Sequence, residues 1–277
     1  MATIQIISDL HLEEHEDYDR FKIEPRTKYL ALLGDIGNVD LQRNKCLGFL
    51  REQLCKFRIV FFVPGVEEVY GSSWGKVTEI LEEFEQQTRQ DGTLFGEFVL
   101  LNKRAFQIPK TSTFILGCSL FSSVQYRSDG HPREGLNQPS RIKYWNTSDH
   151  HRAHVSDLEW LNEMVASVAE ESGHDSGFKI AIFTHWSPSR DERAVDQLFE
   201  DESYKCGFST DLSQEECYLN RGVVLWAFGH THYNCDFFAD RRPDALGVVP
   251  PIRILTNQRG YSVEPAVGFD GDKTVEI

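Results

Sequence analysis

Histidine and aspartate side chains recur at the ends of short apolar segments in this 277-residue chain. The most informative segment is Leu225–Phe228, which stops at Gly229 and is followed by His230 and His232. An apolar run rich in β-forming residues that stops at a glycine predicts a buried strand ending in a loop. Ligands of open α/β sheets gather at the carboxyl ends of strands, and neutral imidazole is the commonest metal ligand. The His-x-His pair is therefore a candidate metal site, although one such pair alone also occurs in solvated loops.

The same arrangement follows three more apolar segments. Asp9 and His11 follow the run 4–8, Asp35 follows the run 29–33 and Gly34, and His185 follows the run 178–183. Carboxylate and imidazole ligands together suit first-row metals such as Mn, Fe or Zn. Six candidate ligands exceed the needs of one catalytic ion and suit two ions bridged by a carboxylate. The alternative is that all six are polar loop residues without a metal.

Composition and charge restrict the class of protein. Apolar residues make up 40% of the chain and aromatic residues 12%, which is typical of a globular protein. The net charge of −14 argues against nucleic-acid and membrane partners, because both present negative charge. No apolar run approaches the roughly 20 residues of a membrane span, and the first residues lack a signal-peptide pattern. The six cysteines show no Cys-x-x-Cys spacing, so we interpret them as reduced thiols of a cytoplasmic protein.

The order of the expected elements favours an α/β fold. Helical periodicity occurs at 43–56, from Ser73 onward and around 158–168, and short strands are expected at 59–63, 98–101, 105–108 and 113–116. Roughly the last 40 residues predict β-hairpins and a terminal strand. No repeat and no linker interrupts this order, so we predict one domain over residues 1–277.

In two further segments the polar side chains have more than one possible role. Residues 124–146 are rich in Gly, Pro, Arg and Asp and predict a surface loop or lid. Its arginines (Arg127, Arg133 and Arg141) either bind an anion or are ordinary surface charge. His150, His151 and His154 precede the helix expected around 158–168. We interpret these histidines as a solvated helix start, with a second metal site as the alternative.

These motifs, in this order, resemble those of the calcineurin-like metallophosphoesterases over nearly the whole chain. Ser8-Asp9-Leu10-His11 is similar to the Asp-x-His block of that family, Gly34-Asp35 to its Gly-Asp block, Thr184-His185 to its single-His block and Gly229-His230-Thr231-His232 to its Gly-His-x-His block. The resemblance implies a four-layer αββα sandwich of two mixed β-sheets.

The resemblance also implies roles for the six candidate ligands. Asp9, His11 and His232 would hold a first metal, His185 and His230 a second, and Asp35 would bridge the two. In that family a hydroxide bridging the metals attacks phosphorus, and both ions neutralise charge in the transition state.

One block departs from the family pattern. Gly65-Val66-Glu67-Glu68 stands where the family has Gly-Asn-His-Glu or Gly-Asn-His-Asp. Valine cannot coordinate a metal, and a carboxylate near a phosphate repels it. Glu67 is therefore a substitute ligand of the second metal, a general acid or base, or a surface carboxylate that points away. We expect it to face the substrate cavity, to stay ionised beside two cations and to favour a neutral or cationic substrate.

Three hypotheses of function follow. The first is a metal-dependent hydrolase of a small-molecule phosphate ester, with Asp35 and Glu67 as candidate catalytic residues. The second is a repurposed metalloenzyme with lyase, isomerase, oxidative or other hydrolytic chemistry on a small metabolite. The third is a non-catalytic pseudo-phosphoesterase, against which the six retained ligands argue. We expect one or two ions of Mn, Fe or Zn and no nucleic-acid or membrane partner; the oligomeric state is not predicted.

Overall fold

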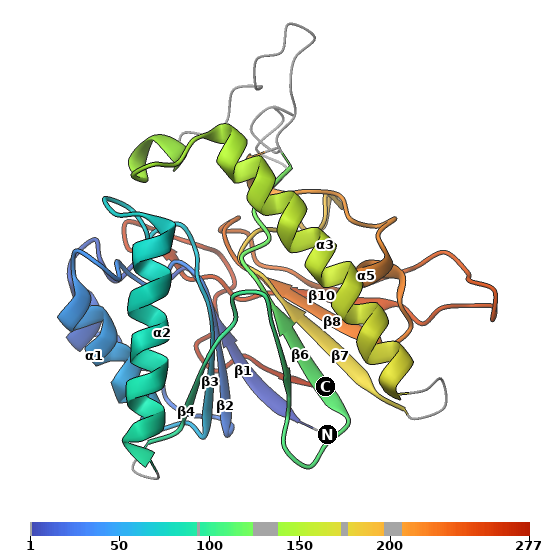
Figure 1. Cartoon of the computed structure of the whole chain (residues 1–277), viewed down its shortest axis with the longest axis horizontal. Helices are drawn as coiled ribbons and strands as arrows, with labels where there is room; N and C mark the ends of the chain where they lie inside the picture. Colours follow the sequence, from blue (N-terminus) through green and yellow to red (C-terminus); the bar gives the residue numbers. More distant parts are fainter. Residues whose placement is uncertain (1, 93–94, 124–137, 173–176, 197–206) are drawn as a thin grey trace, which may run out of the picture.

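The computed structural model describes residues 2–92, 95–123, 138–172, 177–196 and 207–277. Two β-sheets lie face to face, with helices on both outer sides (Figure 1). Helices α1 (Arg43–Leu54) and α2 (Trp74–Gln90) cover one sheet, and α3 (Thr147–Ser172) and α5 (Glu216–Leu219) cover the other. The predicted four-layer αββα sandwich of two mixed sheets is thereby confirmed.

The first sheet has the strand order β13-β1-β2-β3-β4. Its strands are β1 (Thr3–Ile7), β2 (Tyr29–Leu33), β3 (Ile59–Val63), β4 (Glu97–Leu100) and β13 (Thr274–Glu276). All pairs are parallel except β13 with β1. Parallel neighbours need a crossover connection, which α1 supplies between β2 and β3 and α2 between β3 and β4. The short 3₁₀ helix η1 (Asp17–Asp19) lies between β1 and β2.

The second sheet has the strand order β5-β6-β7-β8-β10-β9. Its strands are β5 (Arg104–Gln107), β6 (Thr113–Gly117), β7 (Lys179–Phe183), β8 (Val223–Phe228), β9 (Asp236–Ala239) and β10 (Ile252–Thr256). The predicted hairpins and terminal strand of the last segment are present, because β9 and β10 pair antiparallel and β13 ends the chain; the parallel pairing of β10 with β8 inside the sheet was not predicted. The pair β11 (Gly260–Tyr261) and β12 (Glu264–Pro265) does form an antiparallel hairpin.

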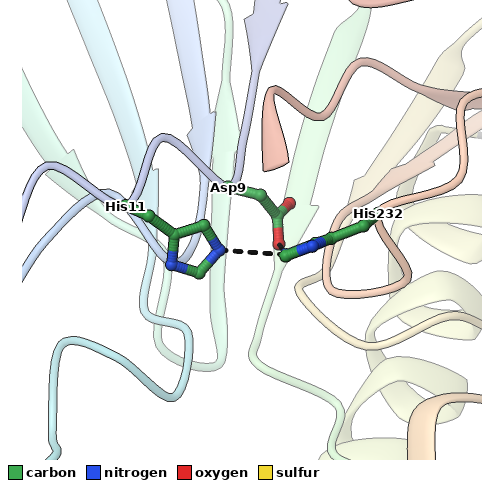
Figure 2. A group of neighbouring side chains, drawn as sticks. All are labelled: Asp9, His11 and His232. Carbon is green, nitrogen blue, oxygen red and sulfur yellow. Dashed lines mark hydrogen bonds and ion pairs between the residues drawn. The ribbon is translucent and has the colours of Figure 1, made fainter. Parts of the chain in front are cut away.

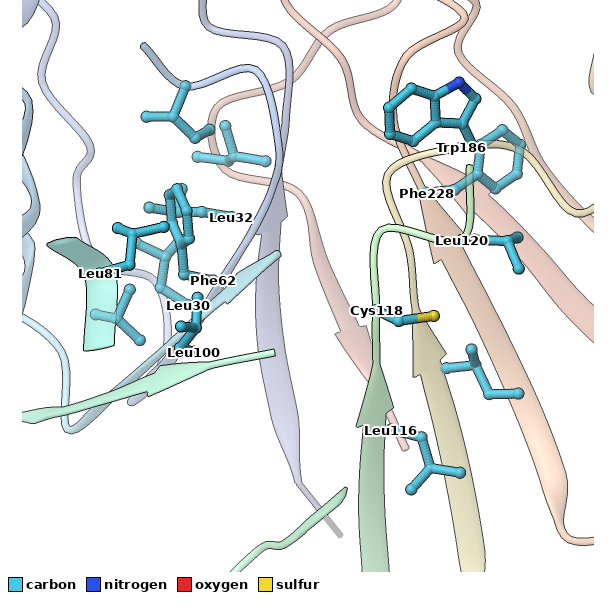
Figure 3. Close-up of a cluster of buried hydrophobic side chains, with 14 of the residues drawn as sticks. Leu30, Leu32, Phe62, Leu81, Leu100, Leu116, Cys118, Leu120, Trp186 and Phe228 are labelled. Carbon is cyan, nitrogen blue, oxygen red and sulfur yellow. The ribbon is translucent and has the colours of Figure 1, made fainter. Parts of the chain in front are cut away.

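The parallel strands are buried on both faces. On β2, Ala31 and Leu33 point into the core between the sheets, whereas Leu30 and Leu32 pack under the helices. Figure 3 shows this outer core in two parts, with Phe62 and Leu81 beside the first sheet and Leu116 and Phe228 beside the second. Strands that are buried on both sides have continuous apolar sequences, so their positions were predictable.

Two further expectations concern thiols and membranes. Cys46, Cys55, Cys118, Cys217 and Cys235 are free thiols, in agreement with the predicted reduced state; Cys206 lies outside the described residues. In the described part of the chain, every helix is too short or too polar to cross a membrane.

Candidate metal centre

The six predicted ligands meet at one end of the two sheets, where β1, β2, β7 and β8 end. Backbone hydrogen bonds join the loops in pairs. The amides of Asp9 and His11 donate to Gly34 and Asp35, each at 3.0 Å, and the amide of Gly229 donates to His185 at 3.0 Å. Loops from both sheets therefore contribute side chains to one place.

The first ligand group is Asp9, His11 and His232 (Figure 2). The Nε2 atoms of the two histidines lie 2.9 Å apart, and His232 Nε2 lies 3.4 Å from Asp9 Oδ1. The Asp9 carboxylate is fully buried and accepts hydrogen bonds from the backbone amide of His230 at 3.0 and 3.1 Å. Two imidazole nitrogens and one carboxylate oxygen thus converge on one point, which is a donor set that suits Mn, Fe or Zn.

The second ligand group is Asp35, His185 and His230. Asp35 Oδ2 lies 3.3 Å from His185 Nε2 and 3.9 Å from His230 Nδ1. The Nδ1 atom of His185 donates to the carbonyl of Leu33 at 2.9 Å, which leaves the lone pair of Nε2 directed into the site. This Nε2 atom is buried and, apart from the ion-pair contact with Asp35, has no hydrogen-bond partner among the described residues. A metal ion is the partner that such an atom fits, so these residues suit the group that the sequence predicts.

Backbone strain is concentrated at the candidate ligands. Five of them have positive φ angles: Asp9 (52°), His11 (48°), Asp35 (52°), His230 (71°) and His232 (50°). A residue other than glycine in this region costs about 1–3 kcal/mol and persists only where its surroundings hold it in place. Asp and His tolerate the region better than most residues. Strain at five of six predicted ligands indicates that this end of the fold is built for function.

Two glycines let the ligands pack directly on the backbone. Gly34 has a φ of 87°, and a Cβ there would stand 2.3 Å from His185 Nδ1. A Cβ on Gly65 would stand 2.4 Å from Asp35 Oδ1. Both contacts are far too short for real atoms, so larger residues at these positions would displace Asp35 or His185.

Glu68 is a positioning residue that the sequence analysis did not single out. Its fully buried carboxylate accepts hydrogen bonds from the backbone amides of Asp35 (3.0 Å), Ile36 (2.7 Å) and Gly65 (2.7 Å). It therefore fastens the loop after β2 to the loop after β3. The sequence signal for this role was the position of Glu68 at the end of the block Gly65-Val66-Glu67-Glu68.

Val66 and Glu67 both line a cavity of about 690 Å³ beside the ligands, and Val66 also packs in the outer core. Glu67 groups with His11 and Glu13, not with the second ligand group, so a replacement for the missing second-metal ligand is not supported. Burial, with Asp35 and Glu13 nearby, raises the pKa of Glu67 to about 9. The ionised form of Glu67 that the sequence analysis expects therefore requires cations beside this carboxylate.

Three other residues contact the first ligand group without any clear sequence signal. Glu13 Oε1 lies 3.2 Å from His11 Nδ1, an arrangement in which a carboxylate orients a ligating imidazole. Gln258 accepts a hydrogen bond from the backbone amide of His232 at 2.7 Å. The ring of Tyr261 packs against His11, with the ring centres 4.2 Å apart. Glu13 stands two residues after His11, whereas the other two come from distant sequence.

The predicted solvated helix start at His150, His151 and His154 is wrong for two of them. Helix α3 begins at Thr147, and His150 and His154 are buried on its inner face. His150 Nε2 accepts a hydrogen bond from the amide of Ser122, and His154 Nδ1 lies 3.0 Å from the carbonyl of Leu120. Because residues four apart share one helix face, both rings reach the loop after β6. They support that loop, and neither belongs to a ligand group found among the described residues.

Trp186 and Phe121 form the apolar wall behind the second ligand group. The ring of Trp186 packs against His185 and His230, with centre-to-centre distances of 4.9 and 4.7 Å. Phe121 stacks on Trp186 at 4.8 Å. Both aromatic side chains are buried, so they pack in the core.

The predicted surface loop or lid over residues 124–146 is only partly described. Arg127 and Arg133 lie outside the described residues. Arg141 belongs to the short 3₁₀ helix η3 (Gln138–Arg141), and its guanidinium lies over the ring of Tyr70, 3.8 Å from the ring centre. Tyr70 lines the cavity, so Arg141 lies near the cavity without lining it.

Comparisons with known proteins agree with this geometry. A family model described as calcineurin-like phosphoesterase matches residues 2–234. A protein of Acanthamoeba polyphaga mimivirus, described as "Uncharacterized protein L509", is 27% identical over 281 residues, which cover 95% of this chain and 93% of that protein. The crystal structure of the phosphopantetheinyl hydrolase PptH from Mycobacterium tuberculosis is similar in fold, with a TM-score of 0.58 and 15% identity. That similarity covers 94% of this chain and 90% of the other.

Proposed function

Because the chain belongs to the calcineurin-like phosphoesterase family, we propose that it is a metal-dependent hydrolase whose substrate is a small-molecule phosphate ester. The observation that carries the proposal is the meeting of two ligand groups, Asp9–His11–His232 and Asp35–His185–His230, at the end of the two sheets. Two such groups of carboxylate and imidazole suit a pair of Mn, Fe or Zn ions. The net charge of −14 supports an enzyme without nucleic-acid or membrane partners, and the free thiols support a cytoplasmic location.

Each side chain has a role in the proposed reaction. Asp9, His11 and His232 would hold the first ion and His185 and His230 the second, with Asp35 between them. When bound, the two ions generate a nucleophile from water and neutralise the charge that develops on the phosphoryl oxygens. Glu13 orients His11, and the carbonyl of Leu33 orients His185, through the Nδ1 atom of each ring. Asp35 and Glu67 line the cavity and would contact the substrate.

Hydrolysis of chromogenic phosphate esters tests this proposal. We expect the Mn-loaded protein to hydrolyse 4-nitrophenyl phosphate or bis(4-nitrophenyl) phosphate and to lose this activity on chelation. His185→Ala should reduce kcat by about 10²-fold or more, because it removes a second-group ligand. The control His15→Ala removes an exposed histidine outside both ligand groups and should leave kcat unchanged. Metal-loaded protein that hydrolyses neither ester would contradict the proposal.

The second candidate, a metalloenzyme with other chemistry, is favoured by one observation. A buried carboxylate at Glu67 lines the cavity where a phosphate would bind and would repel it. A double variant, Val66→Asn with Glu67→His, restores the residue types of the family block. If this variant hydrolyses 4-nitrophenyl phosphate at least tenfold faster than the wild type, the native site has moved away from phosphate chemistry. Comparable rates would favour the phosphoesterase.

A further inference from the structure

Two carboxylates at the edge of the metal centre have acceptor oxygens without a hydrogen-bond partner among the described residues. Glu13 and Glu67 each have a carboxylate oxygen within 4.8 Å of the other and of a His11 ring nitrogen. Glu67 is only 7% exposed, and among the described residues its carboxylate makes no hydrogen bond or ion pair. Glu13 contacts His11 through Oε1, whereas its Oε2 atom is buried without a hydrogen-bond partner in the described part of the chain. Two buried carboxylates this close together repel each other unless one of them takes up a proton or a positive group lies between or beside them.

A further metal ion fits these two carboxylates poorly. While His11 Nε2 faces the first ligand group, its Nδ1 atom carries the proton that is donated to Glu13. His11 therefore has no lone pair left for another ion. Glu13 and Glu67 alone offer fewer protein ligands than a zinc, calcium or similar site needs. A protonated amine has no such requirement, because it needs only hydrogen-bond acceptors around it.

The cavity beside the pair suits an organic cation. Its wall includes Tyr70 and Tyr261; Arg141 covers one face of the Tyr70 ring and His11 packs against the Tyr261 ring, so only the remaining ring faces can attract a cation. No lysine or arginine is among the described residues that line it. The volume of about 690 Å³ is large enough for a ligand that reaches from the metal ligands to Glu67.

We propose that Glu13 and Glu67 form a subsite for a protonated amine, so that the substrate carries an ammonium group a short distance from its phosphate. The inference rests on the proposed function for the phosphate end of the substrate. It explains how a carboxylate can stand in a phosphate-binding cavity. The ammonium group offsets the repulsion between Glu67 and the phosphate, and esters without an amine bind less tightly.

Calorimetric titration with two phosphonates tests the subsite without turnover. The probes are 2-aminoethylphosphonate and propylphosphonate, which differ by an ammonium group in place of a methyl group. We expect the Mn-loaded protein to bind the amine about tenfold more tightly, as one charge-assisted hydrogen bond would provide. Glu67→Gln, which keeps the shape of the side chain, should lower this preference to about twofold or less. Glu13→Gln should weaken it as well.

The matched control is Glu264→Gln, which removes the same charge from an exposed position on the same cavity wall. It should keep the preference for the amine. Equal affinities of the wild type for both probes would overturn the inference, as would an unchanged preference in Glu67→Gln. An equal loss in Glu264→Gln would assign the preference to the general charge of the cavity and overturn the inference too.

Metal content distinguishes the amine from a metal ion. We expect Glu67→Gln to contain as much metal per chain as the wild type in elemental analysis. One ion fewer per chain would overturn the inference in favour of a metal at Glu13 and Glu67. A protein that prefers the amine but hydrolyses no phosphate ester would contradict the proposed function and leave the amine subsite standing.

Discussion

An Asp35→Asn variant is expected to hydrolyse phosphate esters at least about 10²–10³-fold more slowly than the wild type. Asp35 stands 3.3 Å from His185 Nε2 and 3.9 Å from His230 Nδ1, and it would lie between the two metal ions. An amide offers one weak oxygen donor and no negative charge, so two neighbouring cations would repel each other without compensation. The steady-state kcat for 4-nitrophenyl phosphate is the quantity to compare.

Asparagine is the right substitution at this position, because it removes the negative charge and keeps the backbone conformation and one hydrogen bond of Asp35. Asp35 has a φ of 52°, and asparagine is one of the residues that tolerate this region. The hydrogen bond from the amide of Glu67 to Asp35 Oδ1 (2.8 Å) can be kept by the amide oxygen of asparagine. The control is Asp19→Asn, an exposed aspartate of η1. A kcat within threefold of the wild-type value for Asp35→Asn would remove Asp35 from the mechanism.

A Glu68→Ala variant is expected to lose about 3 kcal/mol or more of unfolding free energy. The backbone amides of Asp35, Ile36 and Gly65 would lose a buried acceptor, at about 1–3 kcal/mol for each unsatisfied group. The loops after β2 and β3 would separate, and metal affinity should fall together with stability. Urea unfolding followed by circular dichroism measures the change.

Two comparisons make this result specific to the buried contacts. Glu68→Gln keeps one acceptor oxygen and should lose less stability than Glu68→Ala. Glu264→Ala removes an exposed carboxylate and should change the unfolding free energy by less than about 0.5 kcal/mol. A loss below about 1 kcal/mol in Glu68→Ala would show that water or other residues satisfy these three amides.

The predictable part of the fold was the part with strong local signals. The strands β1, β2, β3, β7 and β8 are buried on both faces, so each appears as an apolar run, and the candidate ligands follow four of them directly. Helix α2 was predicted from its periodicity after Ser73, and the hydroxyl of Ser73 caps it by accepting a hydrogen bond from the amide of Lys76. In these regions local pattern and tertiary environment agree.

Other features depend on contacts between distant residues and had no local signal. The parallel pairing of β10 with β8 was not predicted, and the ion pair of Arg253 with Asp236 of β9 is visible only in the structure. The start of α3 was missed because the inner face there is polar, with His150 and His154 in place of apolar residues. Gln258 and Tyr261 approach the ligands only through the fold, more than 20 residues after His232 in the chain.

The altered sequence block could be interpreted only in part. The loss of the family's metal-binding asparagine at Val66 was evident from residue type alone. Glu67 lines the cavity as expected, but residue type alone could not fix its direction, because this depends on the course of the loop after β3, which Glu68 holds against Asp35. The proximity of Glu67 to Glu13 joins residues more than 50 positions apart and emerged only from the fold.

The most direct test of the account is anomalous X-ray scattering from crystals of the Mn-loaded protein. It locates each metal ion and its ligands independently of any reaction. We expect two anomalous peaks, one contacted by Asp9, His11 and His232 and the other by His185 and His230, with Asp35 between them. A single peak, no peak, or a peak held by Glu13 and Glu67 would contradict the two-metal centre on which the proposed function rests.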